Sequence, residues 1–273
     1  MCDTCGCNIT PGNEHLISAG GKLEKTEGGR EAITVLHDLL IENDHTAQHN
    51  REHFNAHGVM AINLMSSPGA GKTALLEATI KTLGDAFRLA VIEGDLETEN
   101  DAERIRSHGV TAIQITTGSA CHLDAYMVHD ALHQLDLSYV DIVFIENVGN
   151  LVCPASFDLG QHSNVVLLSV PEGDDKPAKY PVMFRTADMV MLSKADLLPV
   201  LDDFNPQRAE QHLRNLASAA PLIHTSAKSG DGMESWLQWL REAVGEHRLA
   251  LKASPPAQAH HHDHHHDHDH GQP

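Results

Sequence analysis

Ser66-Ser-Pro-Gly-Ala-Gly-Lys-Thr73 follows a short apolar run and opens a segment whose apolar residues have helical spacing. Between a strand and a helix, this stretch is typical of a phosphate-binding loop. Its glycines let backbone N–H groups face phosphate oxygens, and the helix N-terminus adds a partial positive charge. Lys72 is expected to reach the β- and γ-phosphates, and Thr73 to offer its hydroxyl to Mg²⁺. The residues predicted to bind nucleotide here are Ser67, Gly69, Ala70, Gly71, Lys72 and Thr73, while Ser66 stands where the motif usually has its first glycine.

Short apolar runs alternate with amphipathic segments on both sides of this loop. The expected strands are 59–65, 89–92, 111–115, 139–145, 164–170, 188–192 and 221–224. Strands that are apolar throughout indicate a sheet covered on both faces, and the helices between them indicate parallel crossovers. The sequence therefore predicts an α/β fold, a doubly wound and mostly parallel sheet with helices on both faces.

The remaining segments divide the chain into four parts. Residues 1–29 form a cysteine cluster and a glycine-rich linker, and residues 30–57 form an N-terminal helix on the core that Gly58 ends. Residues 58–250 form the nucleotide-binding domain, which finishes with a helix from about 233 to 244. Residues 251–273 form a histidine-rich tail that is expected to be disordered.

A second motif addresses which base is bound. Ser193-Lys-Ala-Asp196 follows a predicted strand and resembles the N-K-x-D guanine motif of G proteins, with Ser193 in place of Asn. The Asp196 carboxylate can accept both the N1–H and the exocyclic amine of guanine, whereas adenine would leave it without donors. The other predicted base contacts are Lys194 and the loop Ser226, Ala227 and Lys228. GTP is favoured over ATP, and the serine predicts a weaker tether to the phosphate-binding loop.

Two acids follow strands at the edge where the phosphates should lie. Asp95 is expected to position Mg²⁺ or water, and Glu146, in Glu146-Asn-Val-Gly149, to hold Mg²⁺ through water. Lys72, Asp95 and Glu146 are the predicted catalytic residues, and Thr73, Asp95 and Glu146 the magnesium ligands. Asn150 stands where some GTPases carry a water-orienting Gln, and no arginine finger is evident, so slow intrinsic hydrolysis is predicted.

Composition excludes several classes of function. Against 19 basic residues the chain has 38 acidic ones, a formal charge of −19, which disfavours a nucleic-acid partner. There is neither an apolar run long enough to span a membrane nor a signal-peptide pattern, so a cytoplasmic location is expected. The cysteines should then remain thiols, available as metal ligands.

Three groups of residues are candidate metal ligands. Cys2, Cys5 and Cys7 pack three thiols into six residues, a pattern that suits square-planar Ni²⁺ or tetrahedral Zn²⁺. Cys121 and His122, at the start of a predicted helix, and Cys153 leave carboxyl ends of strands and can converge beside the 146–149 loop. The tail offers low-affinity ligands for Ni²⁺ or Zn²⁺: His260, His261, His262, His264, His265, His266, His268 and His270.

A further histidine series has two interpretations. His45, His49, His53 and His57 follow one another at four-residue intervals on the predicted N-terminal helix. Such neighbours can share a metal ion, but the same pattern suits a solvated helix face, which we favour.

The motifs together resemble the HypB family of hydrogenase-maturation GTPases over nearly the whole chain. They are the N-terminal cysteines, the loop 66–73, Cys121-His122, Glu146-Asn-Val-Gly-Asn-Leu-Val-Cys-Pro154 and Asp175-Lys-Pro-Ala-Lys-Tyr-Pro181. The resemblance implies a SIMIBI-class P-loop fold, GTP and GDP as ligands, nucleotide- or metal-linked homodimers, high-affinity nickel at the N-terminal cysteines, and a regulatory nickel or zinc site at Cys121, His122 and Cys153. It also implies a HypA-type nickel chaperone and the hydrogenase large-subunit precursor as partners. The alternatives are a urease-accessory GTPase of the UreG type, a nickel storage protein, and a small-molecule P-loop kinase, which would prefer ATP.

Overall fold

The computed structural model describes residues 30–95, 100–118 and 120–253, the side chains of 30–38 and 85 excepted. Within them lies one seven-stranded sheet in the order β3-β2-β4-β1-β5-β6-β7, and every neighbouring pair is parallel. The strands are β1 (Met60–Ser66), β2 (Leu89–Asp95), β3 (Thr111–Thr116), β4 (Ile142–Glu146), β5 (Ser163–Ser169), β6 (Met189–Ser193) and β7 (Leu222–His224). The predicted fold class and all seven strands are confirmed, and carboxyl ends of neighbouring strands meet at one edge.

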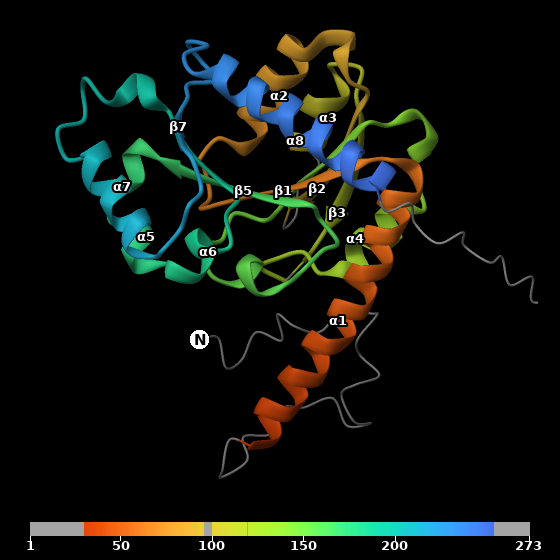
Figure 1. Cartoon of the computed structure of the whole chain (residues 1–273). Helices are drawn as coiled ribbons and strands as arrows, with labels where there is room; N and C mark the ends of the chain where they lie inside the picture. The colour runs from red at the N-terminus through yellow and green to blue at the C-terminus, as the bar shows by residue number, and fades with distance from the viewer. Residues whose placement is uncertain (1–29, 96–99, 119, 254–273) are drawn as a thin grey trace, which may run out of the picture.

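Helices cover both faces of the sheet (Figure 1). On one face α2 (Lys72–Leu83), α3 (Asn100–Arg106) and α8 (Met233–Ala253) share a core cluster with the strands. The other face is covered by α1 (Arg30–His57) and α4 (Ala125–Leu132) over one end of the sheet, and by α6 (Pro181–Arg185) and α7 (Pro206–Asn215) over the other. The short α5 (Lys176–Lys179) precedes α6. This double cover explains why the strands are apolar on both sides.

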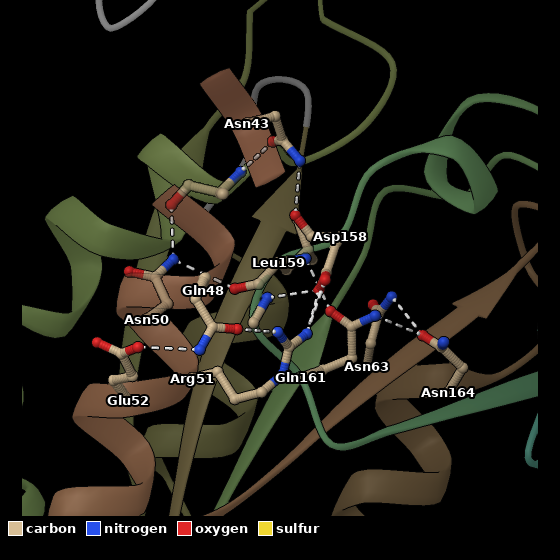
Figure 2. Close-up of polar contacts among 12 residues, drawn as sticks. Asn43, Gln48, Asn50, Arg51, Glu52, Asn63, Asp158, Leu159, Gln161 and Asn164 are labelled. Atoms are coloured by element: carbon tan, nitrogen blue, oxygen red, sulfur yellow. Dashed lines mark hydrogen bonds and ion pairs between the residues drawn. The ribbon is translucent and has the colours of Figure 1, made fainter. Parts of the chain in front are cut away.

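Polar side chains fasten α1 to the domain. Asn43 donates from Nδ2 to the Asp158 carbonyl at 2.8 Å and accepts the Ala125 N–H at Oδ1 at 2.9 Å. The Arg51 guanidinium bridges both carboxylate oxygens of Asp158 at 2.7 and 2.8 Å, as Figure 2 shows. At Gly160, where φ is +90°, a Cβ would lie 2.6 Å from the Ala47 carbonyl oxygen. The helix can therefore approach this loop closely only because residue 160 is glycine.

Element boundaries differ from the sequence expectation in three places. Residues 137–139 form a 3-10 turn before β4, because the Asp136 side chain accepts the Ser138 N–H at 3.1 Å. The last helix runs past Val244 to Ala253, so the first residues expected in the tail are helical. Cys121 and His122 do not begin a helix: Asp124 caps α4 by accepting the Met127 N–H at 2.8 Å, which places both metal-ligand candidates in the preceding loop.

His162 links β1 to the end of α1 and predicts a pH dependence of stability. The Ala61 N–H donates to its Nδ1 at 2.9 Å, so its Nε2 carries the proton that meets Asn55 Oδ1 at 3.1 Å. Burial, with the positive neighbours His247 and Arg51, lowers the pKa of His162 to about 3. Between that value and the ordinary pKa of 6.5 the unfolded chain binds a proton that the folded chain does not.

We expect the free energy of unfolding to fall as pH drops below 6.5. The contribution of His162 is at most about 1.4 kcal/mol per pH unit. Urea denaturation at pH 7 and pH 5 should show a smaller loss for His162→Asn, whose amide oxygen can accept the same N–H, than for the wild type. His224→Asn, at an exposed position on β7, is the matched control and should keep the wild-type loss. An unchanged pH dependence in His162→Asn would contradict this assignment.

Candidate nucleotide and metal sites

The loop 67–71 connects β1 to α2 and forms a cradle at the carboxyl edge of the sheet. Gly69 and Gly71 have φ of +72° and +99°, a backbone conformation that favours glycine. Lys72 and Thr73, the first residues of α2, are both buried. The Lys72 ammonium donates to Ser66 Oγ at 3.2 Å, and the Thr73 hydroxyl donates to Glu146 Oε1 at 2.9 Å. Serine at position 66 thus holds the lysine in the loop.

Two acids that the sequence analysis did not select lie beside Glu146. Glu93 on β2 is directly opposite Glu146 on β4 in the sheet register, and Asp101 comes from α3. A carboxylate oxygen from each of Glu93, Asp101 and Glu146 lies within 4.8 Å of the others. Asp95, the predicted ligand, ends β2 and is not part of this group. Glu93 and Asp95 lie two residues apart on β2 and therefore share one face of the sheet. Only the register of β2 against β4 decides that Glu93, and not Asp95, lies opposite Glu146.

Burial raises the pKa values of both Glu93 and Glu146. Burial, and the neighbouring Glu146, raise the pKa of Glu93 to about 11, so Glu93 is protonated at neutral pH in the absence of a metal ion. Burial also raises the pKa of Glu146, while Lys72 opposes that shift. The Lys72 ammonium is thus the neighbour that favours the ionised form of Glu146.

The residues present fit a magnesium ion. Among the described side chains, Glu93 Oε2 and Glu146 Oε2 are buried without a hydrogen-bond partner. Mg²⁺ prefers oxygen ligands, and a bound cation would favour the ionised form of both carboxyls. Thr73, Glu146 and Glu93 would hold it, and it would neutralise charge on the phosphates.

A cavity of about 280 Å³ lies between the phosphate-binding loop and the ends of β6 and β7. It is lined by Ser193, Lys194, Asp196, Ser226, Ala227 and Lys228, together with Ala70, Gly71 and the apolar side chains of Leu75 and Met191. This arrangement brings all the predicted base contacts to one hollow. Asp196 is only partly buried, so its carboxylate is accessible to a base.

Two hydrogen bonds tether this cavity to the phosphate-binding loop. Ser193 Oγ donates to the Ala70 carbonyl at 2.7 Å, and the Lys194 ammonium donates to the Gly69 carbonyl at 2.7 Å. Lys194 has a positive φ of 57°, which costs conformational energy in a residue with a side chain. The expected tether is therefore present, with serine performing the role of asparagine and lysine adding a second bond.

The cysteines and histidine of the domain converge in a separate group. Cys121 Sγ lies 3.2 Å from Cys153 Sγ and 3.8 Å from His122 Nδ1. One ligand atom of each residue lies within 4.8 Å of those of the other two. His122 is buried and its ring packs on Phe157, whose centroid is 4.1 Å away, whereas both cysteines are partly exposed. Two sulfur atoms and a nitrogen at this spacing can coordinate one thiophilic metal ion.

Burial favours the uncharged forms of Cys121 and His122. Burial and the nearby Cys153 raise the pKa of the Cys121 thiol to about 11. Burial lowers the pKa of His122 to about 4. Neutral imidazole is the metal-binding form, but Cys121 must lose its proton when a cation binds. Metal binding at this group therefore releases protons.

One loop, residues 146–153, joins the carboxylate group to the cysteine group. It begins at Glu146, which accepts the Thr73 hydroxyl, and ends at Cys153. Asn147 accepts the Leu123 N–H at 3.2 Å, next to His122. At Gly149 a Cβ would lie 2.7 Å from Pro68 Cα, so the loop touches the phosphate-binding loop directly. Asn150 donates to the Cys121 carbonyl at 3.2 Å and accepts the Val152 N–H at 2.8 Å. The loop 146–153 therefore contacts both the phosphate-binding loop and the segment that carries Cys121.

The other predicted metal ligands lie outside the described residues. These are Cys2, Cys5 and Cys7, and the eight tail histidines from His260 to His270. Among the residues that are described, no helix combines the length and the apolar character needed to cross a membrane.

A parallel sheet, a phosphate-binding loop opening α2 and an acid paired with its threonine define a P-loop nucleotide-binding protein.

Residues 60–224 match the family model described as CobW/HypB/UreG, nucleotide-binding domain. The hydrogenase maturation factor HypB of Azotobacter vinelandii is 51% identical over 213 residues, which are 78% of this chain and 70% of that protein. The hydrogenase/urease maturation factor HypB of Helicobacter hepaticus is 44% identical, covering 90% of this chain and 98% of that protein.

A solved structure agrees with these relatives. HypB from Helicobacter pylori, crystallised in complex with nickel, superposes with a TM-score of 0.72 at 44% identity and covers 75% of this chain and 96% of that one. This chain belongs to the HypB family of hydrogenase maturation factors.

Proposed function

We propose that this protein is a nickel-binding GTPase that delivers nickel to the large subunit of [NiFe]-hydrogenase during its maturation. The observation that carries the proposal is the loop 146–153, which is bonded to Thr73 at one end and supplies Cys153 at the other. A loop that contacts both sites can make the affinity for the metal ion depend on which nucleotide is bound. Family membership supports hydrogenase as the destination, because the curated relatives carry that role in their names.

The proposed reaction is GTP plus water to GDP and phosphate. Lys72 would neutralise the β- and γ-phosphates, and Thr73, Glu146 and Glu93 would hold Mg²⁺. Asp95, which ends β2 at the same edge, would position the attacking water. Guanine would bind in the cavity beside Asp196. Because the sequence offers no evident arginine finger, turnover in the isolated protein should be slow.

Nickel is the cargo in this proposal. Cys2, Cys5 and Cys7 would hold it tightly, the tail histidines would buffer it, and Cys121, His122 and Cys153 would bind Ni²⁺ or Zn²⁺ under nucleotide control. We further propose the division into residues 1–29, 30–57, 58–250 and 251–273, a nucleotide- or metal-linked homodimer, and a HypA-type nickel chaperone and the hydrogenase large-subunit precursor as partners.

Urease is a second candidate destination. Relatives from Helicobacter hepaticus and Helicobacter pylori are named hydrogenase/urease maturation factors. Either enzyme would receive nickel from the same site, so purified apo-hydrogenase precursor and apo-urease, offered separately with the nickel-loaded protein and GTP, would distinguish the two.

The proposal predicts that the nucleotide changes the rate of Ni²⁺ release. The rate of transfer from the full chain to a chromophoric chelator should differ about tenfold between GDP and a non-hydrolysable GTP analogue, a difference of about 1.4 kcal/mol in the barrier to release. The difference should be confined to the kinetic phase that Cys153→Ala removes. Equal rates in the two nucleotides would refute control by this loop and leave nickel binding independent of GTP.

Asn150→Ala tests the path of coupling without removing a ligand. It deletes the bonds to the Cys121 carbonyl and the Val152 N–H. We expect nickel stoichiometry to stay unchanged and the nucleotide effect on release to shrink at least threefold, since about 1 kcal/mol is the usual net worth of a hydrogen bond. Asn215→Ala, at the exposed end of α7, is the control and should behave as the wild type.

A further inference from the structure

Four histidines from two helices meet on the outer side of the domain. His49 and His53 come from the series on α1, and His129 and His133 come from the end of α4. His133 Nε2 lies 3.1 Å from His129 Nε2, and the His49 ring meets the His129 ring edge-on with centroids 5.1 Å apart. None of these residues belongs to the nucleotide cavity or to the cysteine group.

A buried asparagine determines the tautomer of His129. Asn50 donates from Nδ2 to the carbonyls of Ala125 and Leu159 at 2.8 and 3.2 Å, the latter drawn in Figure 2. Carbonyls only accept, so the amide cannot be reversed, and its Oδ1 faces His129 Nδ1 at 3.0 Å. His129 must therefore carry its proton on Nδ1, so without a metal ion its Nε2 accepts a hydrogen bond from His133 Nε2.

This is the arrangement that orients metal-binding histidines. An imidazole that ligates a metal usually donates its other N–H to a carbonyl or carboxylate, which holds the ring in place. Asn50 is fully buried, so its oxygen is a rigid partner. Burial and then His133 and His49 lower the pKa of His129, and burial followed by His57 and His49 lowers that of His53. Both shifts favour the neutral imidazole of His129 and His53, which is the form that binds metals.

We propose that His129 and His133, with His49 as the third ligand, form a binding site for a divalent late-transition-metal ion, Ni²⁺ or Zn²⁺. Ligand nitrogens about 2.0–2.1 Å from one ion lie roughly 3.0–3.4 Å apart, and the two Nε2 atoms are already at that separation. His49 is exposed and meets the His129 ring edge-on at 5.1 Å between centroids, so its side chain would have to rotate to complete the set. A set of imidazoles selects Ni²⁺ or Zn²⁺ over Mg²⁺ or Ca²⁺, which require oxygen ligands.

The proposed site differs in kind from the cysteine group. Its ligands are imidazoles that are partly or fully exposed, whereas the cysteine group includes the buried His122, so exchange with solvent is direct. It spans α1 and α4, so an ion there would bridge the N-terminal helix to the domain. The proposal does not depend on GTP hydrolysis or on hydrogenase as the destination.

A site-specific measurement separates this site from the other metal ligands of the full chain. Zn²⁺ is added beyond saturation of the cysteines and tail, and the reaction of each histidine with diethyl pyrocarbonate is followed by peptide mass spectrometry at pH 7. His129 and His133 should be protected about tenfold when free Zn²⁺ reaches ten times the dissociation constant. Ni²⁺ should give the same pattern, and Mg²⁺ none.

Matched variants decide between a site and general shielding. His133→Gln should abolish the metal protection of His129, and His49→Gln should weaken it several-fold. His45→Gln, on the same helix but outside the cluster, should leave protection intact. The proposal is overturned if Zn²⁺ leaves the reactivity of His129 unchanged, or if His129 stays fully protected in His133→Gln.

Discussion

Lys72→Met should reduce GTP hydrolysis by about a hundred- to a thousandfold, the usual cost of removing one preorganised charge at a transition state. Lys72 carries a buried ammonium whose positive charge favours the ionised form of Glu146. The same ammonium donates to Ser66 Oγ, directly before the phosphate-binding loop. Methionine keeps the length and the apolar part of the side chain, but it has no positive charge to neutralise the charge that develops on the phosphates. Phosphate release at saturating GTP and Mg²⁺ measures the effect.

Lys81→Met is the control for this change, because Lys81 lies exposed near the end of the same helix. It should hydrolyse GTP at the wild-type rate. If Lys72→Met retains more than about a tenth of the wild-type rate, Lys72 supplies less than about 1.4 kcal/mol at the transition state, and the catalytic role assigned to it is wrong.

Asp196→Asn should weaken GTP binding about a hundredfold, or close to 3 kcal/mol, and should improve the binding of xanthosine triphosphate. The carboxylate accepts from two guanine donors, whereas an amide offers one acceptor and one donor. Xanthine carries an N–H and a carbonyl at the same edge, so it complements the amide. Competition of both nucleotides against a fluorescent GDP analogue measures the exchange of preference.

The cavity position of Asp196 supports this expectation, since its neighbours Lys194 and Lys228 line the same hollow. Asp202→Asn removes an equal charge from an exposed position six residues further on and should leave both affinities unchanged. Loss of GTP binding in Asp196→Asn without any gain for xanthosine triphosphate would place the base elsewhere in the site.

Much of the fold followed from local pattern. Seven apolar runs of strand length predicted the seven strands, and the stretch Ser66–Thr73 predicted the turn from β1 into α2. The predicted helix and strand boundaries were wrong where a single polar side chain decides where an element begins. Asp124 caps α4 and leaves Cys121 and His122 in a loop, and Asp136 closes the 3-10 turn that delays β4.

The candidate sites were predictable only in part. Residues that belong to motifs, such as Lys72 and Asp196, are recognisable because their spacing to a glycine loop or a strand end is local. Glu93 is different, since it acquires a role from lying opposite Glu146 across two strands distant in sequence. His45, His49 and His57 are exposed, as a solvated face predicts, but no periodicity predicts the contact between His49 and His129, which lie 80 residues apart.

The sequence by itself determined the fold class, the phosphate-binding loop and the candidate ligands of the domain, because each rests on short-range spacing that the backbone must obey. Only the tertiary structure decided which of these residues meet. Strand register paired Glu93 with Glu146, the approach of two loops brought Cys121 to Cys153, and the docking of α1 on α4 set His49 against His129. These contacts arise from packing of elements far apart along the chain, and packing depends on all the side chains of the core together.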